Sequence, residues 1–270
     1  MIIFSERING MYRDVRRAIN EKDATVVHDL VKEQVAGGAD VLDINLGPTK
    51  GDAVANFVWL AETVRQAADK PISLDSAKPK LLVEVVPQVA QSLPGAKLVI
   101  NSSKATADDM GMLIPLAAEH GASIIGLTMD EEGPPSSVEK RVECGATFLM
   151  TAMESGLAPE DVYIDPIILP LNVASKQPGY VMEAIRQLSI VNDPPPHFIL
   201  GLSNVSQNCL MHHLINRTYL VMCLAAGLDA AIMDAADKEL VEAAVSAEVL
   251  LEKHLYSDDY LKAWRMQKGL

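Results

Sequence analysis

Short aliphatic runs alternate with longer segments of helical periodicity along the chain, and this alternation restricts the fold more than any other feature. Near-continuous apolarity in a short run is typical of parallel strands that are covered on both faces. Eight such runs occur, at Ile2–Phe4, Val41–Ile44, Ile72–Leu74, Leu98–Ile100, Ser123–Leu127, Val162–Ile164, Phe198–Leu200 and Ala230–Met233. Strands that alternate with helices predict an α/β fold with a parallel sheet.

The segments between these runs carry helix start and stop signals. Asp23 is suited to cap a helix over residues 25–35, because the apolar residues there fall on one stripe and Gly37 follows. Pro79 suits the first turn of a helix after the third run. Asn216 is suited to cap a helix that ends at Gly227.

Two prolines and the chain length complete the prediction of the architecture. Pro87 and Pro115 fall inside helical patterns, so we expect them to kink those helices or to mark their ends. A chain of 270 residues with no Gly, Ser or Pro-rich linker predicts one domain over residues 1–270. The most economical fold is a single (β/α)8 barrel, and a doubly wound sheet is the alternative.

Composition excludes several classes of partner. The chain is 49% hydrophobic and carries a net charge of −13, which predicts a soluble, folded protein with no general basic surface for nucleic acid. Its three cysteines form no Cys-x-x-Cys pair, so neither a disulfide framework nor a cysteine metal site is expected. No apolar run reaches the ~18 residues of a membrane span, and the first run is too short for a signal peptide. We therefore expect a cytoplasmic protein.

Polar residues follow each predicted strand, and in a barrel the carboxyl ends of the strands converge on the face where active sites form. They are Glu6, Arg7 and Asn9, then Asn45, Asp75, Asn101, Thr128, Asp130, Asp165, Ser203, Asn204, Gln207 and Asp234. Helix or turn capping would explain any one of them about as well as function does. As a set, they predict a single pocket lined by carboxylates and amides.

The chemistry of these polar residues favours ligand binding over nucleophilic catalysis. The chain contains no Gly-x-Ser-x-Gly, no phosphate-binding loop and no His-Glu-x-x-His motif, and no metal site is predicted. A carboxylate can accept both parallel N–H groups of an amino-pyrimidinone edge, and such charge-assisted bonds contribute about 1.5–3 kcal/mol each. A pterin-sized heterocycle is therefore a reasonable ligand.

Six motifs resemble those of the methyltetrahydrofolate:corrinoid protein methyltransferases, which are similar to the folate module of cobalamin-dependent methionine synthase. The motifs occur in the same order, at Ser5–Gly10, Val41–Asn45, Leu74–Ser76, Ile100–Ser102, Tyr163–Pro166 and Gly201–Asn208. The resemblance implies a pterin-binding (β/α)8 barrel. It further implies transfer of a methyl group, in either direction, between N5 of tetrahydrofolate and the cobalt of a corrinoid.

By position, the resemblance also assigns roles to single residues. Asp75, Asn101 and Asp165 would hold the pterin ring, and Gly201, Ser203 and Gln207 would line the same pocket. Asn204 would contact N5 as the catalytic residue. Glu6, Asn9, Asn45 and His212 are further candidates for substrate contacts.

One departure from the family pattern follows Cys209. Where relatives carry an arginine, this chain has Met211, His212 and His213, and we leave open whether a histidine replaces it. No Asp-x-His-x-x-Gly motif for corrinoid binding is present, so the corrinoid should arrive on a separate protein. The resemblance also implies a homodimer.

Two alternative functions remain. Dihydropteroate synthase shares the barrel and pterin pocket, but Asn45–Pro48 replaces its Gly-Gly-Glu-Ser-type sequence and its Arg-x-His is missing near Asp234. The other alternative is a non-catalytic folate or corrinoid carrier. An amide at the position expected to face N5 favours catalysis.

Overall fold

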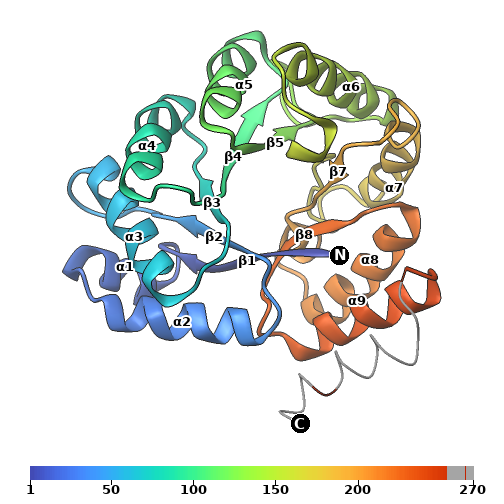
Figure 1. The fold of residues 1–270 in the computed structure, drawn as a ribbon. Helices are drawn as coiled ribbons and strands as arrows, with labels where there is room; N and C mark the ends of the chain where they lie inside the picture. Colours follow the sequence, from blue (N-terminus) through green and yellow to red (C-terminus); the bar gives the residue numbers. More distant parts are fainter. Residues whose placement is uncertain (254–264, 266–270) are drawn as a thin grey trace.

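Eight parallel strands form the centre of the protein in the computed structural model, which describes residues 1–253 and 265 (Figure 1). The strands are β1 (Ile2–Asn9), β2 (Val41–Asn45), β3 (Ile72–Asp75), β4 (Leu98–Lys104), β5 (Ser123–Leu127), β6 (Val162–Asp165), β7 (His197–Phe198) and β8 (Ala230–Met233). From β1 to β7 each strand pairs with its sequence neighbours, and β8 pairs with β1. All eight predicted strands are confirmed, although β7 is shorter than expected.

The sheet closes between β7 and β8. Asp229 N donates to Phe198 O at 3.3 Å, Ile232 N donates to Leu200 O at 2.8 Å, and Gly201 forms a parallel bridge with Ile232. A closed parallel sheet confirms the single (β/α)8 barrel and excludes the doubly wound sheet. The predicted domain runs to residue 270, so residues 254–264 and 266–270 lie outside the part described.

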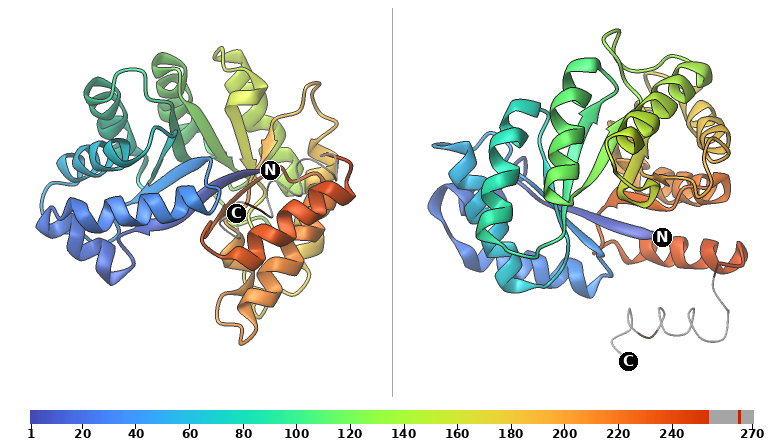
Figure 2. Two further views of the ribbon diagram at one scale, coloured as in Figure 1. Left: turned by 60° about the horizontal axis from the view of Figure 1, so that its bottom comes forward. Right: turned by 45° about the horizontal axis from the view of Figure 1, so that its top comes forward.

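Helices surround the barrel, as the ribbon views show (Figures 1 and 2). They are α1 (Arg13–Glu21), α2 (Ala24–Ala36), α3 (Ala53–Ala67), α4 (Pro79–Ser92), α5 (Ala107–His120), α6 (Val138–Glu154), α7 (Gln177–Leu188), α8 (His212–Ala226) and α9 (Lys238–Leu250). Two short 3-10 helices, η1 (Pro159–Asp161) and η2 (Leu202–Ser206), precede β6 and follow β7. Helix α1, which the sequence pattern does not predict, adds a second helix between β1 and β2.

Most of the predicted helix signals are confirmed. The Asp23 carboxylate accepts from Thr25 N at 3.0 Å at the start of α2, and Pro79 is the first residue of α4. Gly227 ends α8 with a φ of 113°, in the left-handed region that favours glycine.

One helix prediction is wrong and another is wrong in part. Asn216 lies inside α8, because that helix already begins at His212. Pro87 and Pro115 do not mark helix ends, because α4 and α5 continue past them, and a kink at either residue stays a prediction. Each of these two helices buries an apolar face, and that packing outweighs the cost of one internal proline.

The barrel interior holds its own small apolar cluster, separate from the larger core between the sheet and the helices. It contains Phe4, Val41, Val99, Ile125, Tyr163, Ile199 and Ala230. Alternate residues of a strand face the same side, so residues two positions further on also face the interior, closer to the carboxyl ends. Glu6, Asp43, Asn101 and Asp165 occupy such positions. A layer of polar side chains therefore lies above the apolar layer, and we call it the barrel mouth.

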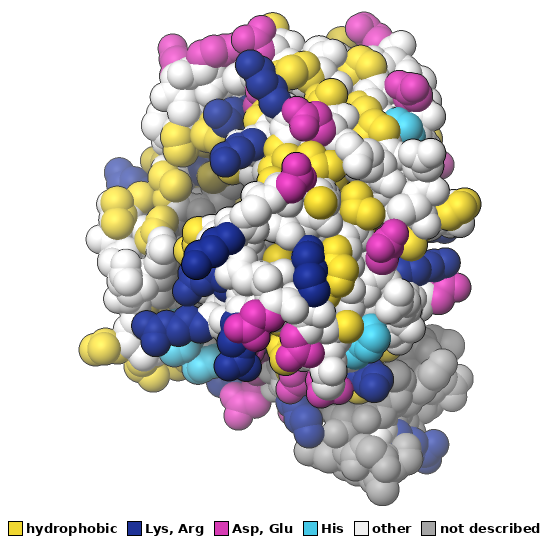
Figure 3. All heavy atoms as spheres, turned by 90° about the vertical axis from the view of Figure 1, so that its left-hand side faces the viewer, with side chains coloured by type: hydrophobic (Ala, Val, Ile, Leu, Met, Phe, Trp, Pro, Cys, Tyr) yellow, Lys and Arg dark blue, Asp and Glu magenta, His cyan; other side chains and the backbone are white. Residues whose placement is uncertain are grey.

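On the outer surface, Lys and Arg side chains lie among acidic and apolar ones. Figure 3 shows this mixture on the face that is at the left of Figure 1. In residues 1–253 and 265, no helix is both long and apolar enough to cross a membrane.

Candidate active site

Strand register places the predicted site residues of the first four strands at one level. Asn9 pairs with Asn45, Asn45 with Asp75, and Asp75 with Asn101 across neighbouring strands. On the other side of the mouth, Asp165 ends β6 beside Leu127 of β5. The structure therefore brings Asp75, Asn101 and Asp165 to one end of the barrel.

Two amide–carboxylate pairs cross this part of the mouth. Asn45 Nδ2 donates to Asp75 Oδ2 at 2.8 Å, and Asn101 Nδ2 donates to Asp43 Oδ1 at 3.0 Å. The Ser73 hydroxyl donates to the same Asp43 oxygen. Each pair fixes the orientation of one carboxylate and leaves its other oxygen without a side-chain donor among the described residues.

Sequence reasoning left Asp43 out of the site, although it is buried at the centre of this network. A carboxylate inside an otherwise apolar strand was the available signal, because buried aspartates are rare unless they are hydrogen-bonded. Burial is the main cause that raises the pKa of Asp43, and the charge of Asp75 raises it further. Burial also raises the pKa of Asp75, against the opposing effect of the Asn45 hydrogen bond.

Asp165 is held by backbone donors. Its Oδ1 accepts from Ile167 N at 2.8 Å, and the backbone N–H of Gly201 also contributes a hydrogen bond. Ile167 has a φ of 55°, which is costly for a β-branched residue and occurs mainly where function requires the geometry. Burial raises the pKa of Asp165 to about 6, although the two backbone hydrogen bonds and the charge of Arg141 lower it.

Arg141 of α6 binds the backbone of the loop that follows Asp165, and its side chain has no solvent exposure (0%). Its guanidinium donates to Pro166 O at 2.7 Å, Ile167 O at 3.0 Å and Ser137 O at 2.9 Å, and it also contacts Gln177 Oε1. Nothing in the sequence marked Arg141, because a single arginine on a helix is usually exposed. The structure identifies it as the group that fixes the backbone after Asp165.

Within the Gly201–Asn208 stretch, Leu202–Ser206 form the 3-10 helix η2. Leu202 and Val205 are buried and anchor it, while Ser203, Asn204 and Gln207 are exposed. The Asn204 side chain folds back over Gly201, since a Cβ atom at Gly201 would lie 2.9 Å from Asn204 Nδ2. Gly201 is therefore needed for the close approach of this amide.

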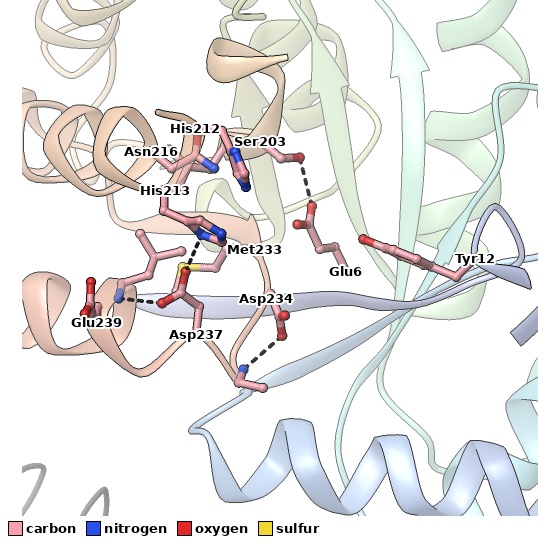
Figure 4. A pocket seen from close by; sticks show the side chains of 13 residues that line it. Glu6, Tyr12, Ser203, His212, His213, Asn216, Met233, Asp234, Asp237 and Glu239 are labelled. Atoms are coloured by element: carbon pink, nitrogen blue, oxygen red, sulfur yellow. Dashed lines mark hydrogen bonds and ion pairs between the residues drawn. The ribbon is translucent and has the colours of Figure 1, made fainter. Parts of the chain in front are cut away.

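A cavity of about 660 Å³ opens beside η2, between β1, β8, α8 and α9 (Figure 4). Of the predicted site residues, Glu6, Ser203 and His212 line it. Ser203 Oγ donates to Glu6 Oε2 at 3.1 Å, which links the first strand to η2. Asp75, Asn101, Asp165 and Asn204 are not among the residues that line this cavity.

Glu6 is the most strongly perturbed carboxyl group on this cavity. Burial raises its pKa to about 7, the Ser203 hydrogen bond opposes this rise, and the negative charge of Asp234 adds to it. A carboxyl group with a pKa near neutrality can both give and accept a proton under physiological conditions.

The remaining candidates have local roles in the structure. Asn9 Oδ1 accepts from Met11 N at 2.9 Å, and Asn45 Oδ1 accepts from Gly47 N at 2.7 Å, so each amide also stabilises the turn after its strand. His212 begins α8 on the cavity wall, and the neighbouring His213 Nδ1 lies 3.4 Å from Asp237 Oδ2. Among the described residues, no group of three or more His, Cys, Asp or Glu is arranged to hold a metal ion.

The arrangement suits a neutral ligand with several N–H donors. Carboxylates that are already oriented by amides accept hydrogen bonds without further ordering, and burial strengthens those bonds. The absence of an oriented nucleophile among these mouth residues leaves proton transfer and electrostatic stabilisation as the chemistry that they can perform.

Comparison with known proteins agrees with this geometry. The family described as "Pterin binding enzyme" matches residues 13–237. A methylcorrinoid:tetrahydrofolate methyltransferase of Eubacterium limosum is 28% identical over 275 residues, covering 99% of this chain and 97% of that protein. Methionine synthase of Mycobacterium tuberculosis is 29% identical over 248 residues, covering 87% of this chain but only 20% of that protein.

Solved structures share the barrel at lower sequence identity. A dihydropteroate synthase from Coxiella burnetii, in complex with pteroic acid, has a TM-score of 0.65 and 14% identity, covering 94% of each chain. The enzyme from Thermus thermophilus has a TM-score of 0.60 and 19% identity, covering 84% of this chain and 87% of that one. At these identities the likeness shows the fold alone.

Proposed function

This chain belongs to the pterin-binding enzyme family, and on that premise we propose that it transfers a methyl group between N5 of tetrahydrofolate and a corrinoid protein. The relative that matches almost its whole length is named for this reaction. The chain spans about a fifth of the methionine synthases that it matches.

One observation carries the proposal. Asp75, Asn101 and Asp165, from three strands, reach one barrel mouth, and the Asn204 amide folds over Gly201 at its edge. Carboxylates at the mouth are suited to accept from the amino-pyrimidinone edge of a pterin, which offers two parallel N–H donors. This leaves the other end of the bicyclic ring, which carries N5, for Asn204.

In the proposed reaction the corrinoid supplies the cobalt that carries the methyl group, and the protein supplies position and electrostatics. Asp75 and Asp165 bind the pterin edge and Asn101 fixes the network around Asp43. Asn204 can donate to an unprotonated N5 or accept from a protonated one, so it can stabilise the transition state in either direction.

The corrinoid is expected to arrive on a partner protein that docks over the carboxyl ends of the strands. This chain contains no corrinoid-binding motif of the Asp-x-His-x-x-Gly type. A homodimer in the cytoplasm stays a prediction, which light scattering and cell fractionation would test. Dihydropteroate synthase is the weaker candidate, since it rests on fold similarity at 14–19% identity.

The deciding experiment mixes the purified protein with a methylated corrinoid protein and tetrahydrofolate and follows the cobalt absorption spectrum. We expect demethylation of the corrinoid with formation of 5-methyltetrahydrofolate, and the reverse reaction from the opposite reactants. An Asn204→Ala variant should turn over about 100-fold more slowly, the typical effect of removing one transition-state donor, with little change in folate affinity. Unchanged spectra in both directions, together with no folate binding, would refute the proposal.

A further inference from the structure

The proposed reaction requires a proton to be exchanged at N5, and no group at Asn204 can exchange it. When N5 of tetrahydrofolate takes a methyl group, its nitrogen becomes positively charged and must release its proton. In the opposite direction N5 keeps the electron pair of the broken N–CH3 bond and must gain a proton. An amide such as Asn204 does not titrate, so another side chain of the mouth is needed.

Three of the mouth carboxyl groups are committed to other contacts. Asp43 accepts from Asn101 and Ser73, and Asp75 accepts from Asn45. Asp165 accepts from the backbone N–H of Ile167, and the charge of Arg141 lowers its pKa. These hydrogen bonds hold each carboxyl group in one orientation and only oppose the rise in pKa that burial causes, and a fixed orientation suits binding of the pterin edge.

Glu6 differs from these three in position and in partners. It lines the open cavity, and among the described residues its side-chain hydrogen bond is the one from Ser203, at 3.1 Å. This contact holds the carboxyl group against Ser203, which directly precedes Asn204, the residue proposed for N5, in the chain. Figure 4 shows the side chains of Glu6 and Ser203 pointing toward each other and joined by this hydrogen bond, with Tyr12 beyond Glu6.

We propose that Glu6 is the acid and base of the reaction, exchanging the N5 proton directly or through one water molecule. This inference rests on the proposed function. In methylation of folate, the N5 lone pair forms the N–CH3 bond, the Co–C bond breaks with its electron pair left on cobalt, and the N5 proton passes to the Glu6 carboxylate. In the opposite direction protonated Glu6 gives its proton to N5 as the N–CH3 bond breaks.

The surroundings of Glu6 suit a group that changes its charge. Its pKa is raised to about 7 by burial and by the charge of Asp234. The other titratable groups that face the cavity are Tyr12, His212, His213, Asp237 and Glu239. Arg7, next in the chain, pairs with Asp14 and lies over the Tyr12 ring, and no positive charge is among the causes that shift the pKa of Glu6.

The test measures single-turnover rates in both directions between pH 5 and 9. We expect folate methylation to speed up as Glu6 ionises and folate demethylation to slow down, both with a midpoint near pH 7. Glu6→Gln should lower both rates about 100- to 10,000-fold, the usual contribution of an acid–base group, and should remove the opposed pH dependence. Affinity for tetrahydrofolate should change less than threefold, and a carboxyl ¹³C signal that titrates near pH 7 should disappear.

Two further variants keep the test decisive. Glu6→Asp retains a carboxyl group and should retain the pH dependence at a lower rate, even if Glu6→Gln fails to fold. Glu183→Gln, on the outer helix α7 and paired there with Arg186, is the matched control and should behave as wild type. Wild-type rates and pH profiles in Glu6→Gln would overturn this inference while leaving the proposed function intact. Failure of the wild-type protein to transfer methyl groups would instead refute the proposed function.

Discussion

Replacing Arg141 by methionine tests whether one buried cation holds the Asp165 loop. The guanidinium donates to the carbonyls of Ser137, Pro166 and Ile167 from a position without solvent exposure. Methionine keeps much of the side-chain volume, so the main change is the loss of these charged hydrogen bonds. Each contributes about 1.5–3 kcal/mol, and a buried acceptor left without a donor costs a comparable amount.

Three such bonds would add up to more than is usually measured, because the loop can relax towards water. We expect Arg141→Met to lower the free energy of unfolding by about 3–5 kcal/mol, the loss typical of removing one partner from a buried charged network. Urea unfolding followed by circular dichroism measures this value. Lys140→Met is the control, because Lys140 pairs with Asp130 at the surface and surface pairs contribute about 0–1 kcal/mol. A loss below about 1 kcal/mol for Arg141→Met, or one equal to that of the control, would refute the reasoning.

Three more outcomes follow from the site geometry. Gly201→Ala should displace the Asn204 amide, since the added Cβ would lie 2.9 Å from its nitrogen, and should slow turnover about as much as Asn204→Ala; a wild-type rate would contradict the packing. Glu6 binds more protons in the folded state than in the unfolded state between pH 4.5 and about 7, because its pKa is raised across that window. The free energy of unfolding of the wild type therefore falls as pH rises through this window. The melting temperature of Glu6→Gln relative to that of the wild type should accordingly be higher at pH 8 than at pH 4.5. Asp165→Asn should weaken folate binding at least tenfold at pH 8, where the carboxylate is ionised, and less at pH 5, since the pKa of Asp165 is about 6; calorimetric titrations showing no pH-dependent difference would exclude a direct contact.

The local sequence pattern was sufficient to predict the eight strands and most of the helices. The run at Ser123–Leu127 forms β5 with the predicted bounds, and Asp23 caps α2 as expected. Strand periodicity also predicts which end of the barrel carries the polar residues, because each of them directly follows an apolar run. The apolar runs and the residues that follow them were therefore enough to include Asp75, Asn101 and Asp165 among the polar residues of one pocket, and the family resemblance singled them out as pterin contacts.

The same local rules failed where a distant contact decides the outcome. Asn216 has the composition of a helix cap, yet α8 begins four residues earlier at His212. β7 is reduced to His197–Phe198, and its last predicted residue, Leu200, instead bonds β8 through Ile232. Packing of neighbouring elements outweighs propensities that differ by less than about 1 kcal/mol per residue.

The amino-acid sequence by itself determined the barrel, the end at which its polar groups gather and the family resemblance of its motifs, because these depend on periodicity and on short contiguous segments. The tertiary structure alone decided how those groups are paired. Asp43 meets Asn101 across 58 residues of chain, Arg141 reaches the loop after Asp165 across 25, and Glu6 meets Ser203 across 197. Hydrogen bonds between such distant residues, and the pKa values that burial sets, exist only once the barrel has closed.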